Sequence, residues 1–138
     1  MKKIILLLGI LSFNAIFYAQ NVKKIAPNTK LLIYYFHITH RCNTCIKIEA
    51  ITKKILETYY ADELKKGVII FQAFNCELPE NKALVDKYQA YGSTLALTPI
   101  VNGKEAGIED LTSFAFSKIN NEEIFTKELQ EKINSYLR

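Results

Sequence analysis

The sequence has only a small excess of positive over negative charge, few cysteines and no internal repeat. Its 138 residues carry 18 Lys and Arg against 14 Asp and Glu, a formal net charge of +4. Lys2 and Lys3 supply two of these charges, and without their N-terminal segment the charge is +2. A nearly neutral domain offers no electrostatic basis for binding nucleic acid. The absence of low-complexity stretches and of long linkers predicts one domain of ordinary size.

The N-terminal segment has the layout of a secretory signal peptide. Lys2 and Lys3 are followed by an apolar run over residues 4–11 and by the small residue Ala19. Such an apolar core is too short to span a membrane stably, and no cysteine follows it to carry a lipid anchor. We expect export to the periplasm or another extracytoplasmic location, with no stable membrane span after cleavage. The predicted divisions are a signal peptide at 1–19, a loosely held N-terminal leader at 20–29 and a folded domain at 30–138.

Cysteine is scarce, and its placement is informative. The three cysteines are Cys42, Cys45 and Cys76, an odd number for an exported chain. The segment Cys42-Asn43-Thr44-Cys45 lies between an apolar run and an amphipathic stretch. Two cysteines in C-x-x-C spacing at the start of a helix can exchange between dithiol and disulfide. The pair therefore predicts thiol redox chemistry.

The pattern of apolar residues predicts an α/β chain. Residues 30–38 form a nearly continuous apolar and aromatic run, typical of a strand buried on both faces of a sheet. From Cys42 onward, apolar residues recur at spacings of three and four, which predicts a helix of about four turns. Gly67 ends this helical region, and residues 68–74 form a second buried strand. Strand, helix and strand in this order imply a right-handed parallel crossover.

The second half of the chain predicts a hairpin followed by helices. Pro79 begins a second helix that Gly92 closes. The turn Asn102-Gly103 is of the kind that joins antiparallel strands, so the sheet is mixed. The remaining predicted elements are a strand at 95–101, its return at 104–108, and helices at 111–118 and 122–137 with a break at Asn120-Asn121.

This order of elements resembles the thioredoxin superfamily over nearly all of residues 30–138. Phe74-Asn75-Cys76-Glu77 is similar to the strand end that reads Asn-x-Asp in thioredoxins. Lys87-Tyr88 is similar to the helix end that follows, and Val101-Asn102-Gly103 to the hairpin turn. The resemblance implies an α/β, thioredoxin-like three-layer fold, with a mixed β-sheet of about four strands and helices on both faces.

Three positions depart from that resemblance. Where thioredoxins carry a cis-proline facing the cysteines, the chain reads Gly92-Ser93-Thr94-Leu95, which places Thr94 at that position. His40-Arg41 precede Cys42, where thioredoxins usually have a Trp. Tyr35 or Phe36 occupies the position of the buried acid of the thioredoxin core strand. More narrowly, residues 34–45 with 92–95 resemble a small group of exported bacterial thioredoxin-like proteins named as nitrophenyl-compound nitroreductase subunits. Nothing in the sequence resembles a flavin site, and no cofactor is expected.

The resemblance implies a thiol-disulfide oxidoreductase that exchanges electrons with a protein partner in the cell envelope, possible partners including a reductase. Cys42, at the helix N-terminus, is the expected nucleophile, because free N–H groups and the helix dipole stabilise a thiolate. Cys45 would resolve the mixed disulfide. Whether the pair donates or accepts electrons depends on its reduction potential, which the sequence does not specify. The residues expected to tune the pair or to bind the substrate are His40, Arg41, Asn43, Thr44 and Thr94, and of these His40 and Arg41 are expected to add positive charge on the side of Cys42.

Three other interpretations stay open at this point. Cys42 and Cys45, with His40 or Cys76, supply soft ligands suited to Cu(I) or Zn, although an adjacent Arg repels a cation. A non-catalytic thioredoxin-fold subunit of a nitroreductase-type complex would use the Thr94 face to hold its partner. A closed structural disulfide is the third. We expect Cys76 to be a buried free thiol. His37 and the aromatic residues of the strands are expected in the core: Tyr34, Tyr35, Phe36, Phe71 and Phe74.

Overall fold

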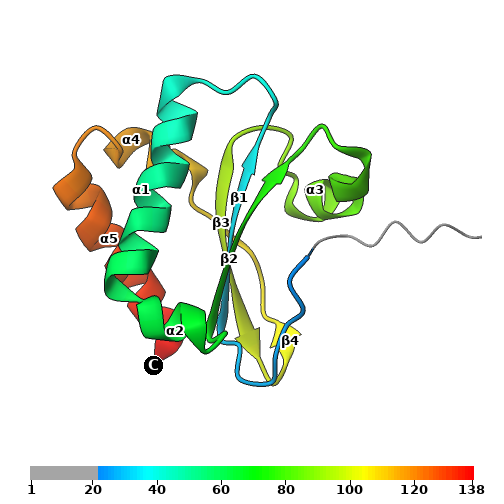
Figure 1. Cartoon of the computed structure of the whole chain (residues 1–138), viewed down its shortest axis with the longest axis vertical. Helices are drawn as coiled ribbons and strands as arrows, with labels where there is room; N and C mark the ends of the chain where they lie inside the picture. The colour runs from blue at the N-terminus through cyan, green and yellow to red at the C-terminus, as the bar shows by residue number, and fades with distance from the viewer. Residues whose placement is uncertain (1–21) are drawn as a thin grey trace, which may run out of the picture.

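The computed structural model describes residues 22–138 as a mixed sheet between two layers of helices (Figure 1). β1 runs parallel to β2 and antiparallel to β3, and the strand order is β2-β1-β3-β4, with β5 also paired to β3. The predicted signal peptide lies outside the described residues. The strands are β1 Leu31–His37, β2 Ile69–Asn75, β3 Thr94–Val101, β4 Lys104–Glu105 and β5 Glu109–Asp110.

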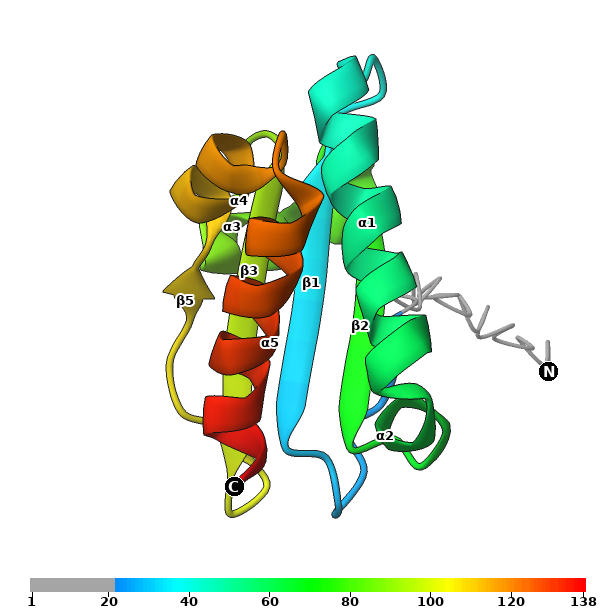
Figure 2. The same ribbon diagram turned by 90° about the vertical axis from the view of Figure 1, so that its left-hand side faces the viewer.

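Helices cover both faces of this sheet. α1, α4 and α5 lie on one face, and α3 lies on the other (Figures 1 and 2). None of the helices within residues 22–138 is long and apolar enough to cross a membrane. The helices on both faces, the parallel pairing of β1 with β2 and the antiparallel pairing of β3 with β4 confirm the predicted α/β three-layer architecture. The helices are α1 Asn43–Tyr59, α2 Ala61–Lys65, α3 Lys82–Tyr88 after a 3-10 turn at Pro79–Asn81, α4 Thr112–Lys118 and α5 Glu122–Leu137.

β1 is the centre of the core, as its unbroken apolar run predicts. It lies between β2 and β3, so its alternating side chains meet helices on both faces. Leu31, Ile33 and Tyr35 pack toward α1 and α5. The opposite face holds an aromatic cluster whose ring centroids lie 5.0–6.4 Å apart. The rings of this cluster belong to Tyr34, Phe36, Phe74 and Tyr88.

Two predicted elements differ in their details. The helix after Pro79 ends at Tyr88, four residues before Gly92, because Gln89 turns left-handed at φ 51° and Ala90 N–H bonds to the Val85 carbonyl at 3.0 Å. The return strand is interrupted: β4 pairs with the end of β3, and β5 pairs with its middle along the same edge. Of the strand predicted at residues 104–108, only 104–105 form a strand, and pairing resumes beyond the predicted range at 109–110.

The predicted turns and breaks fall where the backbone needs them. Gly67, at φ 72°, closes the helical region that α1 and α2 share, with a break between them at Tyr60. The hairpin turn at Asn102 and Gly103 has positive φ at both residues, as a type I′ turn requires. Asn121 begins α5 by accepting the Ile124 N–H at 3.1 Å.

Candidate active site

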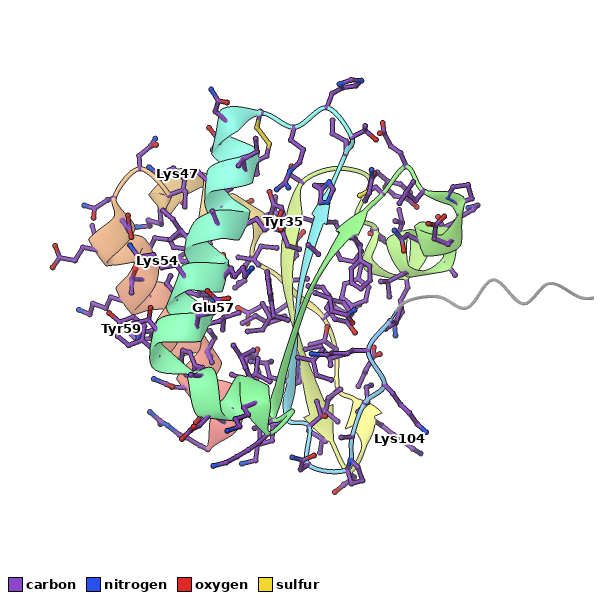
Figure 3. All side chains as sticks on the ribbon, in the orientation of Figure 1. Tyr35, Lys47, Lys54, Glu57, Tyr59 and Lys104 are labelled. Atoms are coloured by element: carbon purple, nitrogen blue, oxygen red, sulfur yellow. A yellow bond between two sulfur atoms is a disulfide. The ribbon has the colours of Figure 1, made fainter. Side chains whose placement is uncertain are left out.

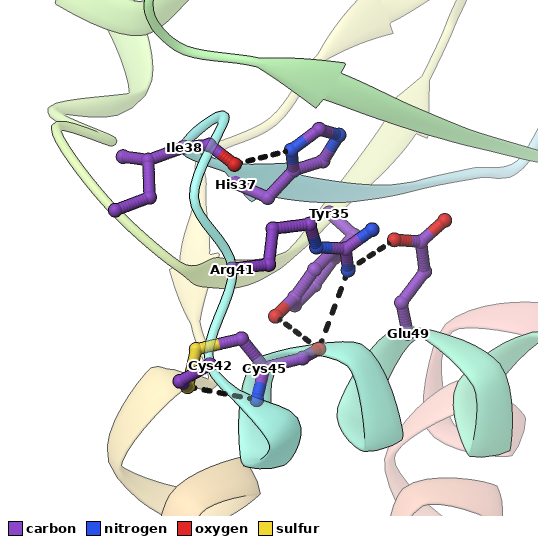
Figure 4. A network of polar contacts seen from close by, with 7 residues as sticks. All are labelled: Tyr35, His37, Ile38, Arg41, Cys42, Cys45 and Glu49. Carbon is purple, nitrogen blue, oxygen red and sulfur yellow. Dashed lines mark hydrogen bonds and ion pairs between the residues drawn. A yellow bond between two sulfur atoms is a disulfide. The ribbon is translucent and has the colours of Figure 1, made fainter.

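The C-x-x-C pair lies at the point where the chain leaves β1 and begins α1 (Figure 4). Cys42 and Cys45 form a disulfide. Cys42 is the N-cap of α1, and its Sγ accepts the backbone N–H of Cys45 at 3.1 Å. A sulfur at this position lies near the free N–H groups of the first helical turn, where negative charge is stabilised. The local fold therefore favours a thiolate on Cys42 once the disulfide is reduced.

The two sulfurs differ in their access to a partner. Cys42 is exposed, whereas Cys45 is only 8% exposed and belongs to the buried face of α1. This difference arises because residue 42 precedes the helix, while residue 45 begins the apolar stripe that packs on the sheet. An external disulfide can reach the first sulfur directly, and the second is sheltered behind it.

Two side chains donate to the Cys45 carbonyl oxygen, and a third, Glu49, pairs with one of them (Figure 4). The Tyr35 hydroxyl donates to the Cys45 oxygen at 2.7 Å, and Arg41 Nη2 donates to the same oxygen at 3.4 Å. Arg41 Nη2 also lies 2.5 Å from Glu49 Oε2, and its guanidinium carbon sits 5.6 Å from the Tyr35 ring centroid. Burial raises the pKa of Tyr35, so this hydroxyl stays protonated as a donor.

Of Tyr35 and Phe36, the two side chains predicted to occupy the position of the buried acid, Tyr35 lies on the face of the sheet that α1 and the cysteine pair cover. It lies between the sheet and α1 (Figure 3), whereas Phe36 belongs to the aromatic cluster on the α3 face. Glu49 was not singled out from the sequence, where it is one of several charged residues between the apolar positions of the helix. Its spacing of four from Cys45 is the available signal, because such residues share one helix face.

The Gly92-Ser93-Thr94 segment approaches the same end of the sheet. Thr94 opens β3 opposite Phe36, is buried, and donates from Oγ1 to the Gly92 carbonyl at 3.4 Å. The Ser93 hydroxyl lies within hydrogen-bonding reach of Tyr35. No peptide bond within residues 22–138 is cis. Thr94 is therefore the neighbour of Ser93, whose hydroxyl is within reach of Tyr35, the side chain that donates to the Cys45 carbonyl.

The loop between β1 and α1 is tied to the loop after β2. The Thr39 N–H donates to Glu77 Oε2 at 2.9 Å, and Asn75 Nδ2 donates to Thr39 Oγ1 at 3.0 Å. The hydrogen bonds from Thr39, with the nearby charge of His40, lower the pKa of Glu77. His40 itself is exposed on this loop. The remaining predicted tuning residues of the motif are Asn43, which is exposed, and Thr44, which is half-buried.

Arg41 lies differently from the sequence-based expectation. We expected it to add positive charge beside the nucleophile, but its guanidinium turns inward toward Cys45 and Glu49, with the side chain 21% exposed. The physical reason is that Glu49 and the Tyr35 ring together supply a partner for the charge and a surface for the planar group.

Cys76 remains a free thiol apart from the pair. It is half-buried, and its Sγ lies 3.6 Å from the Gly92 carbonyl oxygen. Burial raises its pKa, which lowers its reactivity.

Within residues 22–138, no three His, Cys, Asp or Glu side chains come together as a metal site. His37, predicted as a core residue, is half-buried, with Nδ1 3.0 Å from the Ile38 carbonyl oxygen.

Replacing Thr94 by Pro tests the assignment of this segment. Proline is tolerated as the first residue of a strand, and the change alters the backbone beside Ser93 without touching either sulfur. We expect the affinity for a disulfide-containing partner to change several-fold, on the order of 1 kcal/mol, and the reduction potential to move by less than about 30 mV. Thr94→Val is the matched control, because it replaces the hydroxyl by a methyl group and adds no proline ring to the backbone. A large change in potential with unchanged affinity would refute the assignment.

Solved structures that are similar to this chain include one thioredoxin. The chain matches the X-ray structure of Fasciola hepatica thioredoxin at 20% identity, with a TM-score of 0.47, over 79% of this chain and 84% of that one. It matches a malarial protein at 15% identity and a TM-score of 0.41, over 68% and 97% of the two chains. Human ERp44 in its zinc-bound form matches at 14% identity and a TM-score of 0.44, over 70% of this chain and 27% of that one. No family model and no curated protein matches the chain.

Proposed function

We propose that this protein is an exported thiol-disulfide oxidoreductase that exchanges electrons with a protein partner through Cys42 and Cys45. The observation that carries the proposal is the asymmetry of the disulfide: an exposed sulfur at the N-terminus of α1 and a sheltered sulfur one turn further. A nucleophile must be reachable and ionisable, and a resolving thiol must wait within reach behind it. The pair satisfies both requirements.

The reaction consists of two exchanges. The Cys42 thiolate attacks a partner disulfide, forming a mixed disulfide and releasing one partner sulfur as thiolate. Cys45 then loses its proton and attacks the Cys42 sulfur, which frees the second partner sulfur and restores the disulfide seen here. The partner gains two electrons and two protons, and the pair loses them. Running in reverse, the same steps oxidise a partner dithiol.

A protein partner fits the surroundings of the pair better than a small molecule does. Ile46 lies four residues after Cys42, and Tyr91 directly precedes Gly92; both are large apolar side chains with substantial exposure. Exposed apolar residues near a reactive group suit a protein contact. The proposal of export depends on the layout of residues 1–19. A reductase is a candidate source of electrons for the pair.

The reduction potential of the pair tests the proposal. With Cys76→Ser as background, the protein is equilibrated with glutathione buffers and its free thiols are counted. We expect a reversible two-electron couple between about −120 and −270 mV, the range of redox catalysts. A potential below about −300 mV is typical of structural disulfides and would reject the proposal. In that case a non-catalytic subunit, such as the nitroreductase-type one, becomes the better interpretation.

A further inference from the structure

The inward position of Arg41 is not explained by binding a partner. Its guanidinium contacts the Cys45 carbonyl, the Glu49 carboxylate and the Tyr35 ring, all beneath the first turn of α1. The Cys45 carbonyl carbon is three bonds from the Cys45 sulfur, so the guanidinium binds the backbone of the residue that carries the sheltered sulfur.

The cluster is also incompletely satisfied in the disulfide form. Among the described residues, neither Arg41 Nε nor Glu49 Oε2 has a hydrogen-bond partner, although both atoms are buried. The Arg41–Glu49 contact at 2.5 Å is therefore a charge pair without aligned hydrogen bonding. A buried donor without an acceptor calls for a physical reason. Resolution of a mixed disulfide requires a thiolate on Cys45, the residue whose carbonyl this guanidinium binds.

We propose that Arg41, held in place by Glu49 and Tyr35, is a positioning residue that makes Cys45 a better resolving nucleophile. The inference rests on the proposed function and deepens it. A nearby positive charge stabilises the Cys45 thiolate that must attack the Cys42 sulfur. Glu49 both anchors Arg41 and partly neutralises it, so the two charges act on Cys45 in opposite directions.

The groups that face Cys45 come from several elements. β1 supplies Tyr35, the loop before α1 supplies Arg41, and α1 itself supplies Glu49. The segment before β3 supplies Ser93, which does not titrate in the working range. Cys42 is a further ionisable group, and its Sγ accepts the Cys45 N–H.

A two-phase exchange reaction separates the steps. Reduced protein with Cys76→Ser is mixed with a chromogenic aryl disulfide, which releases one equivalent of chromophore on attack by Cys42 and a second on resolution by Cys45. Arg41→Met is expected to slow the second phase about threefold, because a rise of about one pKa unit lowers the thiolate fraction about tenfold and a Brønsted slope of about 0.4–0.5 recovers part of the rate. It is expected to leave the first phase within about twofold. Glu49→Gln is expected to speed the second phase. Arg41→Lys, which keeps the charge, is expected to restore most of the rate.

Lys47→Met is the matched control, because Lys47 is an exposed cation of α1 (Figure 3) whose loss changes the net charge equally. Both phases are expected to stay unchanged. Equal slowing by Lys47→Met, or shifts in the same direction for Arg41→Met and Glu49→Gln, would overturn the inference.

A second measurement separates this inference from the proposed function. With Cys42→Ser and Cys76→Ser together, Cys45 is the single cysteine, and its thiol pKa is read from thiolate absorbance. We expect Arg41→Met to raise that pKa by about one unit and Glu49→Gln to lower it. An unchanged pKa refutes the inference even if the pair turns over. The expected shifts without turnover would instead refute the proposed function alone.

Discussion

Cys45→Ser should convert the protein into a trap for its partner. Cys42 remains exposed at the start of α1 and still attacks a disulfide, but no second thiol is in place to release the adduct. With Cys76→Ser as background, we expect nearly stoichiometric mixed disulfide with oxidised glutathione and a discrete adduct recovered from the cell envelope. Mass spectrometry under non-reducing conditions measures both.

Cys42→Ser in the same background is the control for that experiment. The remaining Cys45 is sheltered, so we expect adduct formation to fall to the level of uncatalysed exchange. Equal adduct yields from the two variants would show that the exposure of Cys42 does not direct the reaction. Failure of Cys45→Ser to form any adduct, even with glutathione, would contradict a redox role.

Phe125→Ala should produce the largest loss of stability among the changes considered. Phe125 is fully buried in the core between the sheet and its helices, and its ring stacks on Phe114 with centroids 5.2 Å apart. Removing a buried aromatic side chain costs about 3–5 kcal/mol through lost transfer energy and the cavity left behind. Since small domains are stable by about 5–15 kcal/mol, the variant is expected to approach the limit of folding. Urea unfolding of the oxidised protein measures the difference.

Phe116→Ala is the matched control, with the same atoms removed from a side chain that is 39% exposed in α4. Its unfolding free energy should fall by less than about 1 kcal/mol. Similar losses for Phe116 and Phe125 would mean that α4 and α5 do not pack as described. A change in the urea dependence for Phe125→Ala would indicate loss of two-state unfolding.

Much of the fold was predictable because its signals are local. The unbroken apolar run of residues 30–38 identified the central strand, and Gly67 and Asn102-Gly103 marked ends and turns through positive φ. The end of α3 was misplaced because Gln89, which has no special preference for the left-handed region, takes that conformation. The return strand after Gly103 was predicted as continuous because a break in pairing leaves no periodic signal in a strand of so few residues.

The sequence by itself determined the C-x-x-C pair, its place between a strand and a helix, and the core strands, because spacing and apolar pattern act within one segment. Tertiary structure alone decided which aromatic residue supports Cys45, because adjacent positions of β1 face opposite layers. It also decided that Arg41 turns inward to Glu49 and Tyr35. Those contacts join β1, the following loop and α1, and a meeting of side chains from separate elements depends on packing that no single segment encodes.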